Sequence, residues 1–230
     1  ASTGVYGIVG NPIEHSLSPI LQNALAKEIN IDMSYVAFHV TDNIKAAIDG
    51  AYLLGIKGFN VTIPFKKDMM NIVTDIDERA KKIGAINTLK KVESGYKGYN
   101  TDILGLKHSI KNNGMSIKGK NVILLGAGGA AKAALYLAIE EDAKSITLIN
   151  RNVKRADELK KEVCDTFKDI SVVSLDELKQ NLDVLEHNDY FVFQTTNVGM
   201  YPKIDECIIY DAGFYEKCDC GIDLIYTPFE

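Results

Sequence analysis

Residues 121–140 read NVILLGAGGAAKAALYLAIE, a stretch typical of a buried strand that turns directly into a helix. Residues 122–125 are wholly apolar and partly β-branched, which favours a strand covered on both faces. Gly126, Gly128 and Ala131 then fit the G-x-G-x-x-G/A pattern of dinucleotide-binding proteins. The first glycine allows the tight turn, the second lets the backbone approach a pyrophosphate, and the small third residue lets the helix pack on the strand. The pattern predicts that this helix N-terminus binds a pyrophosphate.

The same stretch is open to two other interpretations. The glycines could form a tight turn without a ligand, and residues 122–139 are apolar enough to suggest a membrane span. Three glycines and Lys132 interrupt that span, and the strand-like opening does not suit a continuous helix. A turn without a ligand is also disfavoured, because the next predicted strand ends at the distance from Gly126 that is typical of dinucleotide-binding proteins.

The second predicted strand of this region, 145–149, runs into Asn150 and Arg151, 24 residues after Gly126. An acidic residue at this place binds the ribose 2′-hydroxyl of NAD, whereas an arginine accommodates a 2′-phosphate. Two further cations, Lys154 and Arg155, follow. We therefore expect the site to prefer NADP.

The composition of the 230-residue chain is that of an ordinary globular protein, with 46% hydrophobic and 25% charged residues. Its net charge of −5 argues against nucleic acid as a partner, because phosphate binding needs a basic surface. The first residues, ASTGVYGIVG, lack a charged region followed by a long apolar stretch. We therefore expect no signal peptide, no membrane partner and a cytoplasmic location.

The four cysteines, Cys164, Cys207, Cys218 and Cys220, invite a zinc interpretation because three of them fall close together. Zinc ligands usually pair as C-x(2–4)-C, and neither the tighter C-x-C at 218–220 nor Cys207 fits that spacing. We expect reduced structural thiols and no metal.

Strands and helices alternate along the whole chain, which predicts two α/β domains with mostly parallel sheets. The expected strands are 5–9, 34–40, 57–63, 87–92, 96–99, 122–125, 145–149, 171–174, 190–194 and 220–224. The expected helices are 19–29 with Ser18 as N-cap, 44–54, a short one from about 65, 75–83, 102–113, 133–139, 153–166 and 175–182. We place a substrate-binding domain at 1–101 and a Rossmann-type dinucleotide-binding domain at 102–230.

A second polar region lies in the first half, where strands end. In the segment 10–19 (GNPIEHSLSP), Ser16 and Ser18 are two apart, so extended backbone would point both hydroxyls the same way and could hold a carboxylate. Alternatively, Ser18 only caps the helix and Ser16 faces water.

Further polar residues follow the third strand. Asn60 and Thr62 share one strand face, and the Pro64 turn brings Lys66 back toward that strand end, although an early helical lysine such as Lys67 is ordinarily solvated. Asn87 opens another strand and Asp102 a helix, where aspartate is also a favoured cap. If Lys66 and Asp102 are adjacent, the carboxylate would orient the ammonium group and the pair could transfer a proton.

Eight short motifs follow one another along the chain: GNPIEHSLSP, FNVTIPFK, GAINTL, YNTD, GAGGAA, NRN, TTNVGM and DLIY. Their content and order resemble the shikimate dehydrogenase family over nearly the whole chain. The resemblance implies NADPH-dependent reduction of 3-dehydroshikimate to shikimate in aromatic amino-acid synthesis, with Lys66 and Asp102 as the catalytic pair. The implied substrate contacts are Ser16, Ser18, Thr62, Asn87 and Tyr226, with Asn60 supporting the pocket. The implied cofactor residues are Gly126, Ala127, Gly128, Gly129, Ala130, Asn150, Arg151, Asn152, Arg155, Thr195 and Leu224, with Glu78 as a weaker position.

The chain departs from the family pattern at several points. Gln22 stands where the family often has His, and Gln194 where Asn often precedes the Thr-Thr pair. Asn152 replaces a common Thr, which we expect to weaken the 2′-phosphate site slightly. After Glu230 the family continues into helices that carry a substrate-contacting Gln, so we expect residues 1–230 alone to be an incomplete catalyst.

Two alternative functions stay open at this point. One is a quinate/shikimate or aminoshikimate dehydrogenase, which shares the scaffold. The other is a catalytically silent nucleotide-binding regulator, against which the presence of both Lys66 and Asp102 argues. We expect His15 to be structural, and His39, His108 and His187 show no partner pattern. The expected partner is a small-molecule substrate, and the expected state a monomer or homodimer.

Overall fold

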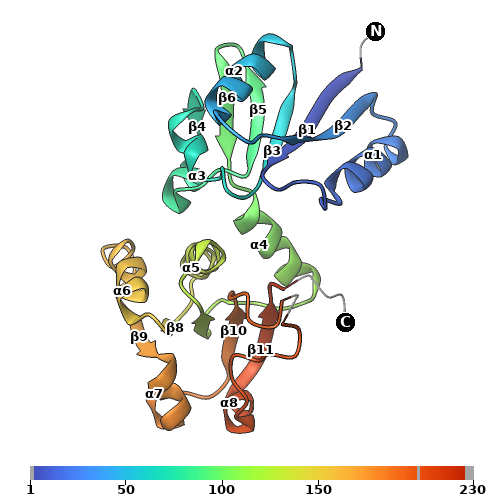
Figure 1. Cartoon of the computed structure of the whole chain (residues 1–230). Coiled ribbons are helices and arrows are strands. Elements are labelled where there is room, and N and C mark those ends of the chain that lie inside the picture. The colour runs from blue at the N-terminus through green and yellow to red at the C-terminus, as the bar shows by residue number, and fades with distance from the viewer. Residues whose placement is uncertain (1–2, 201–202, 226–230) are drawn as a thin grey trace. The chain divides into compact units, whose positions relative to one another are not determined.

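The computed structural model describes residues 3–200 and 203–225, and the chain divides into two compact units, 1–101 and 102–230. Each unit holds one sheet with helices packed against it (Figure 1). In the described part of the chain, no helix is long and apolar enough to cross a bilayer.

The first unit contains a mixed sheet in the order β2-β1-β3-β5-β6-β4. Its strands are β1 (Gly4–Gly10), β2 (Met33–His39), β3 (Gly58–Val61), β4 (Asp75–Ile76), β5 (Thr88–Val92) and β6 (Gly95–Tyr99). Its helices are α1 (Ser18–Glu28), α2 (Ile44–Leu53), the 3₁₀-helix η1 (Asp68–Asn71) and α3 (Glu78–Ile83). β1 pairs in parallel with β2 and β3, while β5 is antiparallel to both β3 and β6, so the expected hairpin at 94–95 is confirmed.

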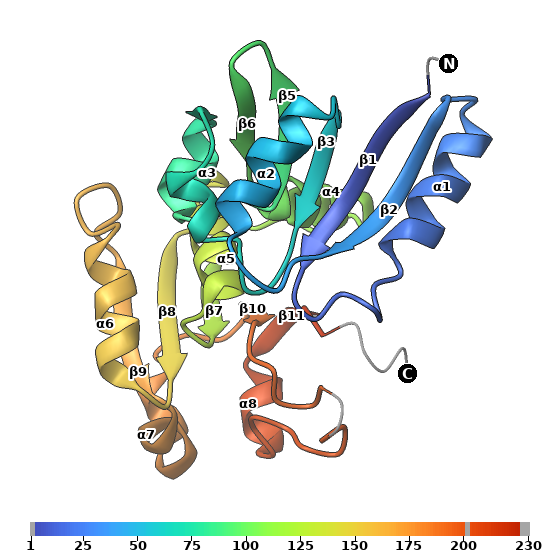
Figure 2. The same ribbon diagram turned by 45° about the horizontal axis from the view of Figure 1, so that its top comes forward.

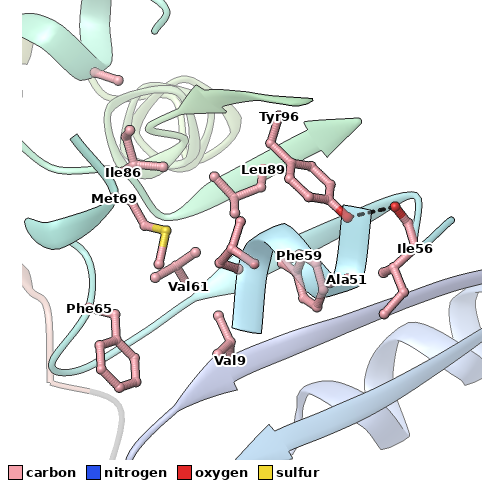
Figure 3. Packing of buried hydrophobic residues seen from close by; sticks show 12 residues of the cluster. Val9, Ala51, Ile56, Phe59, Val61, Phe65, Met69, Ile86, Leu89 and Tyr96 are labelled. Atoms are coloured by element: carbon pink, nitrogen blue, oxygen red, sulfur yellow. Dashed lines mark hydrogen bonds between the residues drawn. The ribbon is translucent and has the colours of Figure 1, made fainter. Parts of the chain in front are cut away.

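The two faces of the first sheet carry separate apolar clusters. Val9 belongs to the larger cluster with Ile48 and Ala51 of α2, whereas its neighbour Ile8 packs with Tyr35 in a smaller one. Alternation along β1 therefore places a core on each side of the sheet. In the larger cluster, the buried Tyr96 of β6 donates its hydroxyl proton to the carbonyl oxygen of Ile56 at 2.8 Å (Figure 3). On the edge of the sheet, α1 runs alongside β2 (Figure 2).

The second unit is a fully parallel sheet in the order β9-β8-β7-β10-β11. Its strands are β7 (Asn121–Leu125), β8 (Ser145–Asn150), β9 (Ile170–Ser174), β10 (Tyr190–Gln194) and β11 (Cys218–Asp223). Its helices are α4 (Asp102–Asn112), α5 (Gly129–Glu140), α6 (Val153–Lys161), α7 (Leu175–Gln180), the 3₁₀-helix η2 (Leu182–Val184) and α8 (Ala212–Glu216). All five residues of β7 are buried, as expected for a central parallel strand.

The strand order reverses beside β7. From β7 the chain moves outward to β8 and β9, and then returns to the other side of β7 to form β10 and β11. This is the 3-2-1-4-5 order of a Rossmann-type sheet, and ligands of such sheets bind at the carboxyl ends of the strands where the order reverses. The two-domain α/β architecture expected from the sequence is confirmed.

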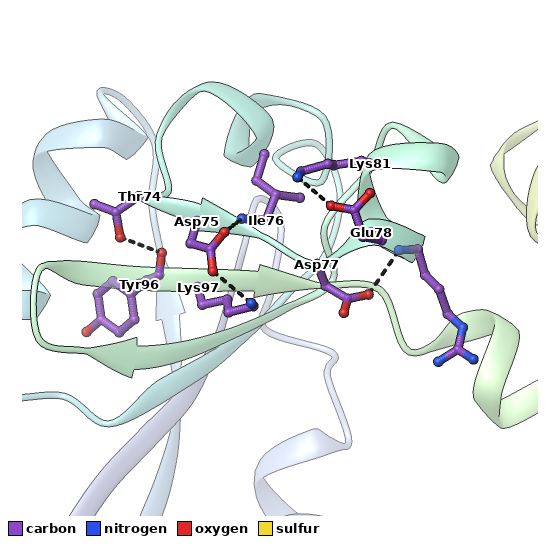
Figure 4. Close-up of polar contacts among 9 residues, drawn as sticks. Thr74, Asp75, Ile76, Asp77, Glu78, Lys81, Tyr96 and Lys97 are labelled. Atoms are coloured by element: carbon purple, nitrogen blue, oxygen red, sulfur yellow. Dashed lines mark hydrogen bonds and ion pairs between the residues drawn. The ribbon is translucent and has the colours of Figure 1, made fainter.

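Several elements differ from the prediction, among them the helix expected at 133–139, which begins at Gly129, and the strand expected at 57–63, which spans Gly58–Val61. The expected helix 75–83 begins only at Glu78, because Asp75 and Ile76 pair with Lys97 and Gly98 of β6 and Asp77 caps α3 through Arg79 N (Figure 4). The expected helix from about 65 is instead the 3₁₀-helix η1. The expected helix 153–166 ends at Lys161, and α8 was not expected because it is only five residues long.

Candidate functional site

In the first unit, the loop after β1 is tied to the segment after β3 by backbone hydrogen bonds. Thr62 N donates to Val9 O at 3.0 Å, and Asn11 N donates to Ile63 O at 2.9 Å. The approach is so close that a Cβ atom on Gly10 would lie 2.5 Å from Thr62 Cγ2. The GNPIEHSLSP and FNVTIPFK motifs therefore form one contiguous surface at the carboxyl ends of β1 and β3.

The structure corrects the extended geometry assumed for Ser16 and Ser18. Leu17 between them has the helical φ and ψ angles of −81° and −7° and occupies the N-cap position of α1, while Ser18 lies inside the helix. In the part of the chain that the structure describes, no side chain caps α1, so the alternative of Ser18 as N-cap is also wrong. Instead, Ser16 Oγ accepts a hydrogen bond from Ser18 N at 3.3 Å, and both serines are half-buried.

His39, at the end of β2, holds the same loop, although the sequence indicated no partner for it. Its Nδ1 lies 3.1 Å from Glu14 Oε1, and its Nε2 lies 3.0 Å from Asn11 Oδ1. The pKa of the exposed Glu14 carboxyl is lowered, chiefly by the backbone N–H groups of Glu14 and Ile13, with smaller contributions from nearby histidines. The histidine thus links the β2 end to the loop that carries the serines.

Asn87 forms the polar centre of this region and is only 8% exposed. Its Oδ1 accepts three hydrogen bonds, from Thr101 N at 3.0 Å, Thr101 Oγ1 at 3.2 Å and Thr88 Oγ1 at 2.9 Å. Its backbone is fixed as well, since Asn87 N donates to Tyr99 O and Val61 N donates to Asn87 O. Thr88 and Thr101, which we did not select from the sequence, lie inside the GAINTL and YNTD motifs.

Asn60 connects this centre to β2. Tyr35 donates its hydroxyl proton to Asn60 Oδ1 at 2.7 Å, and Asn60 Nδ2 donates to Thr88 Oγ1 at 3.3 Å. Burial raises the pKa of the Tyr35 phenol to about 12, so the hydroxyl stays protonated at neutral pH. No motif in the sequence pointed to Tyr35.

Lys66 differs from its neighbour Lys67 in exposure. Lys66 is half-buried, and its carbonyl oxygen accepts a hydrogen bond from Ile86 N at 2.8 Å, whereas Lys67 is exposed. Lys66 is therefore held next to the strand that begins beyond Asn87. Asp102 is exposed and is the first residue of α4, in the second unit. The pairing of Lys66 with Asp102 stays a prediction.

In the second unit, the glycine loop has the geometry that the dinucleotide pattern requires. Gly126 has a φ of +115°, and a Cβ atom there would lie 2.7 Å from Thr195 Oγ1. Gly128 is the N-cap of α5, and among the described residues no side chain caps this helix and none would lie within 4 Å of a Cβ atom on Gly128 or Gly129. Ala131 is completely buried. A bound pyrophosphate would therefore find open space and unoccupied helix N–H groups.

The loop after β8 presents cations to solvent. Asn150 Nδ2 donates to Asn152 O at 2.9 Å, and Asn152 Oδ1 caps α6 by accepting from Arg155 N at 3.1 Å. Asn152 thus performs the capping that a threonine would also perform. The Arg151, Lys154 and Arg155 side chains are exposed. The chemistry of this loop fits a 2′-phosphate.

The loop after β10 completes this edge of the second sheet. Gln194 Oε1 accepts from Thr196 N and Thr196 Oγ1, and Gln194 Nε2 donates to Val198 O, so this family departure shapes the loop that begins with Thr195. Leu224 N donates to Gln194 O at 3.1 Å, which places Leu224 beside the same loop. Tyr226 lies outside the described residues.

One expected position, Glu78, stands apart from these loops. Glu78 lies at the start of α3 in the first unit and forms an ion pair with Lys81 at 2.6 Å (Figure 4).

The cysteines form no disulfide, and burial raises the pKa of Cys218 to about 11. Within residues 3–200 and 203–225, no group of three His, Cys, Asp or Glu side chains is arranged to hold a metal ion.

A Rossmann-type sheet with this glycine loop, joined to a second α/β unit with polar strand ends, defines a dinucleotide-dependent enzyme of two domains. Comparison with known proteins makes the class specific. The family described as "Shikimate dehydrogenase substrate binding domain" matches residues 8–89, and "Shikimate / quinate 5-dehydrogenase" matches residues 108–197. This chain belongs to the shikimate dehydrogenase family, a family of oxidoreductases.

Individual relatives are similar to this chain over its full length. The NADP(+) shikimate dehydrogenase of Methanococcus maripaludis strain C6 is 38% identical over 100% of this chain and 81% of its own length. The enzyme of the same name from Methanocaldococcus jannaschii is 39% identical over 100% of this chain and 80% of its own length. A crystal structure of a shikimate dehydrogenase in complex with NADP+ superposes with a TM-score of 0.86, at 38% identity, over 99% of this chain and 78% of that one.

Proposed function

We propose that this protein catalyses the NADPH-dependent, reversible reduction of 3-dehydroshikimate to shikimate, a step of aromatic amino-acid biosynthesis. The observation that carries this proposal is the similarity to NADP(+) shikimate dehydrogenases over the whole chain, including both sheets. We assign residues 1–101 to substrate binding and residues 102–230 to NADP binding. The open glycine loop and the exposed cations after β8 support the second assignment.

The cofactor residues of the proposal lie mainly on three loops. The backbone of Gly126, Ala127, Gly128, Gly129 and Ala130 would hold the pyrophosphate, and Asn150, Arg151, Asn152 and Arg155 would surround the 2′-phosphate. Thr195 and Leu224 would lie toward the nicotinamide, and Glu78 remains a weaker proposal. When bound, NADPH supplies the hydride that reduces the substrate ketone.

The chain's own contribution to the chemistry is proton transfer at the substrate oxygen. As negative charge develops on that oxygen, the Lys66 ammonium group stabilises it and donates a proton, and Asp102 orients the lysine. In the direction of shikimate oxidation the same pair accepts the proton. Ser16 and Ser18 would bind the substrate carboxylate, Thr62, Asn87 and Tyr226 are the other proposed substrate contacts, and Asn60 would support the pocket.

A second candidate substrate is quinate, because the family that matches residues 108–197 is described by both substrates. Both proposals are tested by following the near-ultraviolet absorbance of NADPH while the protein is supplied with NADP and either shikimate or quinate. Turnover of shikimate alone supports the main proposal. Turnover of quinate with equal or higher kcat/KM would assign the enzyme to the quinate class, and nucleotide binding without turnover would indicate a regulator.

We further propose that the enzyme works in the cytoplasm as a monomer or homodimer, with only small-molecule ligands. The net charge of −5 supports the absence of a nucleic-acid partner. Light scattering coupled to size-exclusion chromatography would determine the oligomeric state, and cell fractionation would determine the location.

A further inference from the structure

A continuous hydrogen-bond chain in the first unit runs from β2 to the polar centre at Asn87. It begins at the Tyr35 hydroxyl, passes through the Asn60 amide and the Thr88 hydroxyl, and ends at Asn87 Oδ1. The three contacts measure 2.7, 3.3 and 2.9 Å. Tyr35 itself is 5% exposed, and it belongs to the smaller apolar cluster with Ile8 and Ile13.

The direction of this chain is forced by its last member. Thr101 N is a backbone donor, so the group that Asn87 turns toward it must be the carbonyl oxygen. Thr88 then uses its single hydroxyl proton to donate to the same oxygen, and it can only accept from Asn60. Asn60 therefore presents its NH2 group to Thr88 and its oxygen to β2. Along this hydrogen-bond chain of described residues, the proton that satisfies Asn60 Oδ1 comes from Tyr35.

The backbone of Tyr35 is held in place by a side chain of α1. Asn23 Oδ1 accepts from Tyr35 N at 2.9 Å, and Asn23 Nδ2 donates to Tyr35 O at 2.8 Å and to Pro19 O at 2.8 Å. The phenol is thus aimed at Asn60 by both the strand and the neighbouring helix. A group positioned this firmly can impose an orientation on the side chains that depend on it.

We propose that Tyr35 is a positioning residue for substrate binding, acting through Asn60 and Thr88 to keep the Asn87 oxygen turned away from the substrate. Any contact of the Asn87 side chain with substrate is then made through its NH2 group, which suits a hydroxyl or carbonyl oxygen of the substrate. Three donors on the Asn87 oxygen also polarise the amide and strengthen its NH2 group as a donor. This inference rests on the proposed function and adds a specificity element to it.

Without the Tyr35 hydroxyl, the chain can reverse. Asn60 would be left with a half-buried oxygen that has lost its Tyr35 donor, so nothing on the β2 side would hold the amide in one orientation, and in the flipped orientation it would accept from Thr88. Thr88 would then donate to Asn60 instead of Asn87, and the Asn87 oxygen would lose one of its three donors. Losing this donor weakens the binding of the substrate in the ground state and in the transition state alike. We therefore expect KM to rise and kcat to stay nearly unchanged.

The test compares Tyr35→Phe with Tyr96→Phe. The two tyrosines are a matched pair, because both are buried in the first unit and each hydroxyl donates one hydrogen bond, but Tyr96 donates to the backbone of Ile56 (Figure 3). We expect Tyr35→Phe to raise the shikimate KM and the calorimetric shikimate Kd about three- to tenfold. The KM for NADP and kcat should stay near the wild-type values. Tyr96→Phe should lower the Tm comparably without changing the shikimate KM.

A second pair of variants tests the middle of the chain. Thr88→Ser keeps a hydroxyl that can donate to Asn87, whereas Thr88→Val keeps the shape and removes the hydroxyl. We expect the serine variant to bind shikimate like the wild type and the valine variant to reproduce the Tyr35→Phe effect.

The outcomes separate this inference from the proposed function. A wild-type protein that neither oxidises nor binds shikimate would overturn the proposed function. A wild-type enzyme that does both, combined with equal shikimate KM values for Tyr35→Phe and Tyr96→Phe, would overturn only the positioning role. Equal KM values for Thr88→Ser and Thr88→Val would do the same.

Discussion

Thr195 closes over the end of β7 by donating two hydrogen bonds to one atom, the carbonyl oxygen of Leu125. Its hydroxyl lies 2.6 Å from that oxygen, and its backbone N–H lies 3.0 Å from it. Thr195 therefore occupies the space that a side chain at Gly126 would need. The N–H group of Gly126 donates to Ile149 O, at the end of β8, at 2.8 Å. The glycine loop is therefore held by β8 and β10 together, at the place where the strand order reverses.

The two glycines of this loop should respond differently to alanine. Gly126→Ala combines a positive φ with a clash against Thr195, so we expect a loss of about 1–3 kcal/mol in the free energy of unfolding. The Cβ atom of Gly128→Ala would contact no described residue, so this variant should keep the wild-type free energy of unfolding. It should weaken NADP binding by roughly tenfold, because the Cβ atom would lie where a pyrophosphate approaches. Urea unfolding and calorimetric titration measure the two effects. Gly105→Ala in α4, also unhindered, is the control that should leave NADP affinity unchanged.

Arg151→Ala should weaken NADP binding much more than NAD binding. No carboxylate stands at this position to bind a 2′-hydroxyl, and the exposed guanidinium can form two hydrogen bonds to a 2′-phosphate. We expect the Kd for NADP to rise about 10- to 100-fold and the Kd for NAD to change little. The exposed Lys168→Ala controls for the change in net charge. Equal losses for both cofactors would contradict the assignment.

Lys66→Ala should lower kcat for shikimate oxidation by roughly 10²–10⁴-fold, the usual effect of removing a positioned acid–base group. The Kd for NADP should stay near the wild-type value, because the proposed cofactor loops lie mainly in the other unit. Lys67→Ala is the matched control, since it removes the same charge from an exposed neighbour. Activity should also rise with pH in the oxidation direction. A Lys66→Ala enzyme with wild-type kcat would show that the proton comes from water or from the substrate.

Alkaline pH should destabilise the first unit through its two buried tyrosines. Burial raises the pKa of Tyr35 and of Tyr96 from 10.0 to about 12, so the unfolded chain loses these protons at lower pH than the folded chain does. Their contribution to stability is complete below pH 10 and is lost between about pH 10 and 12, at up to roughly 1.4 kcal/mol per pH unit for each tyrosine. Urea unfolding at a series of pH values measures the slope. The Tyr35→Phe/Tyr96→Phe double variant should show a shallower slope, and an unchanged slope would contradict this cause.

Much of the fold could be predicted from local sequence patterns. Apolar runs, the glycine loop and the turn at 94–95 depend on residues close in the chain, so their periodicity and turn chemistry already specify the strands and helices. The order of elements was enough to predict two α/β units, and the motifs alone led to the proposal of Lys66, Asn87 and Arg151 as site residues. The capping role of Asn152 was not predicted, although an asparagine directly before a helix is a favoured N-cap.

The tertiary structure alone decided the contacts between distant segments. Asp75 and Ile76 carry a helix-like pattern but became a strand, because the edge of β6 offered them backbone partners. Tyr35 and Asn60 are 25 residues apart, and His39 and Asn11 are 28 apart, so neither pair has a local signature. Such contacts depend on which strands become neighbours, and that choice follows from the packing of the whole sheet. The sequence by itself therefore determined the loops and their chemistry, while the sheet decided which side chains orient one another.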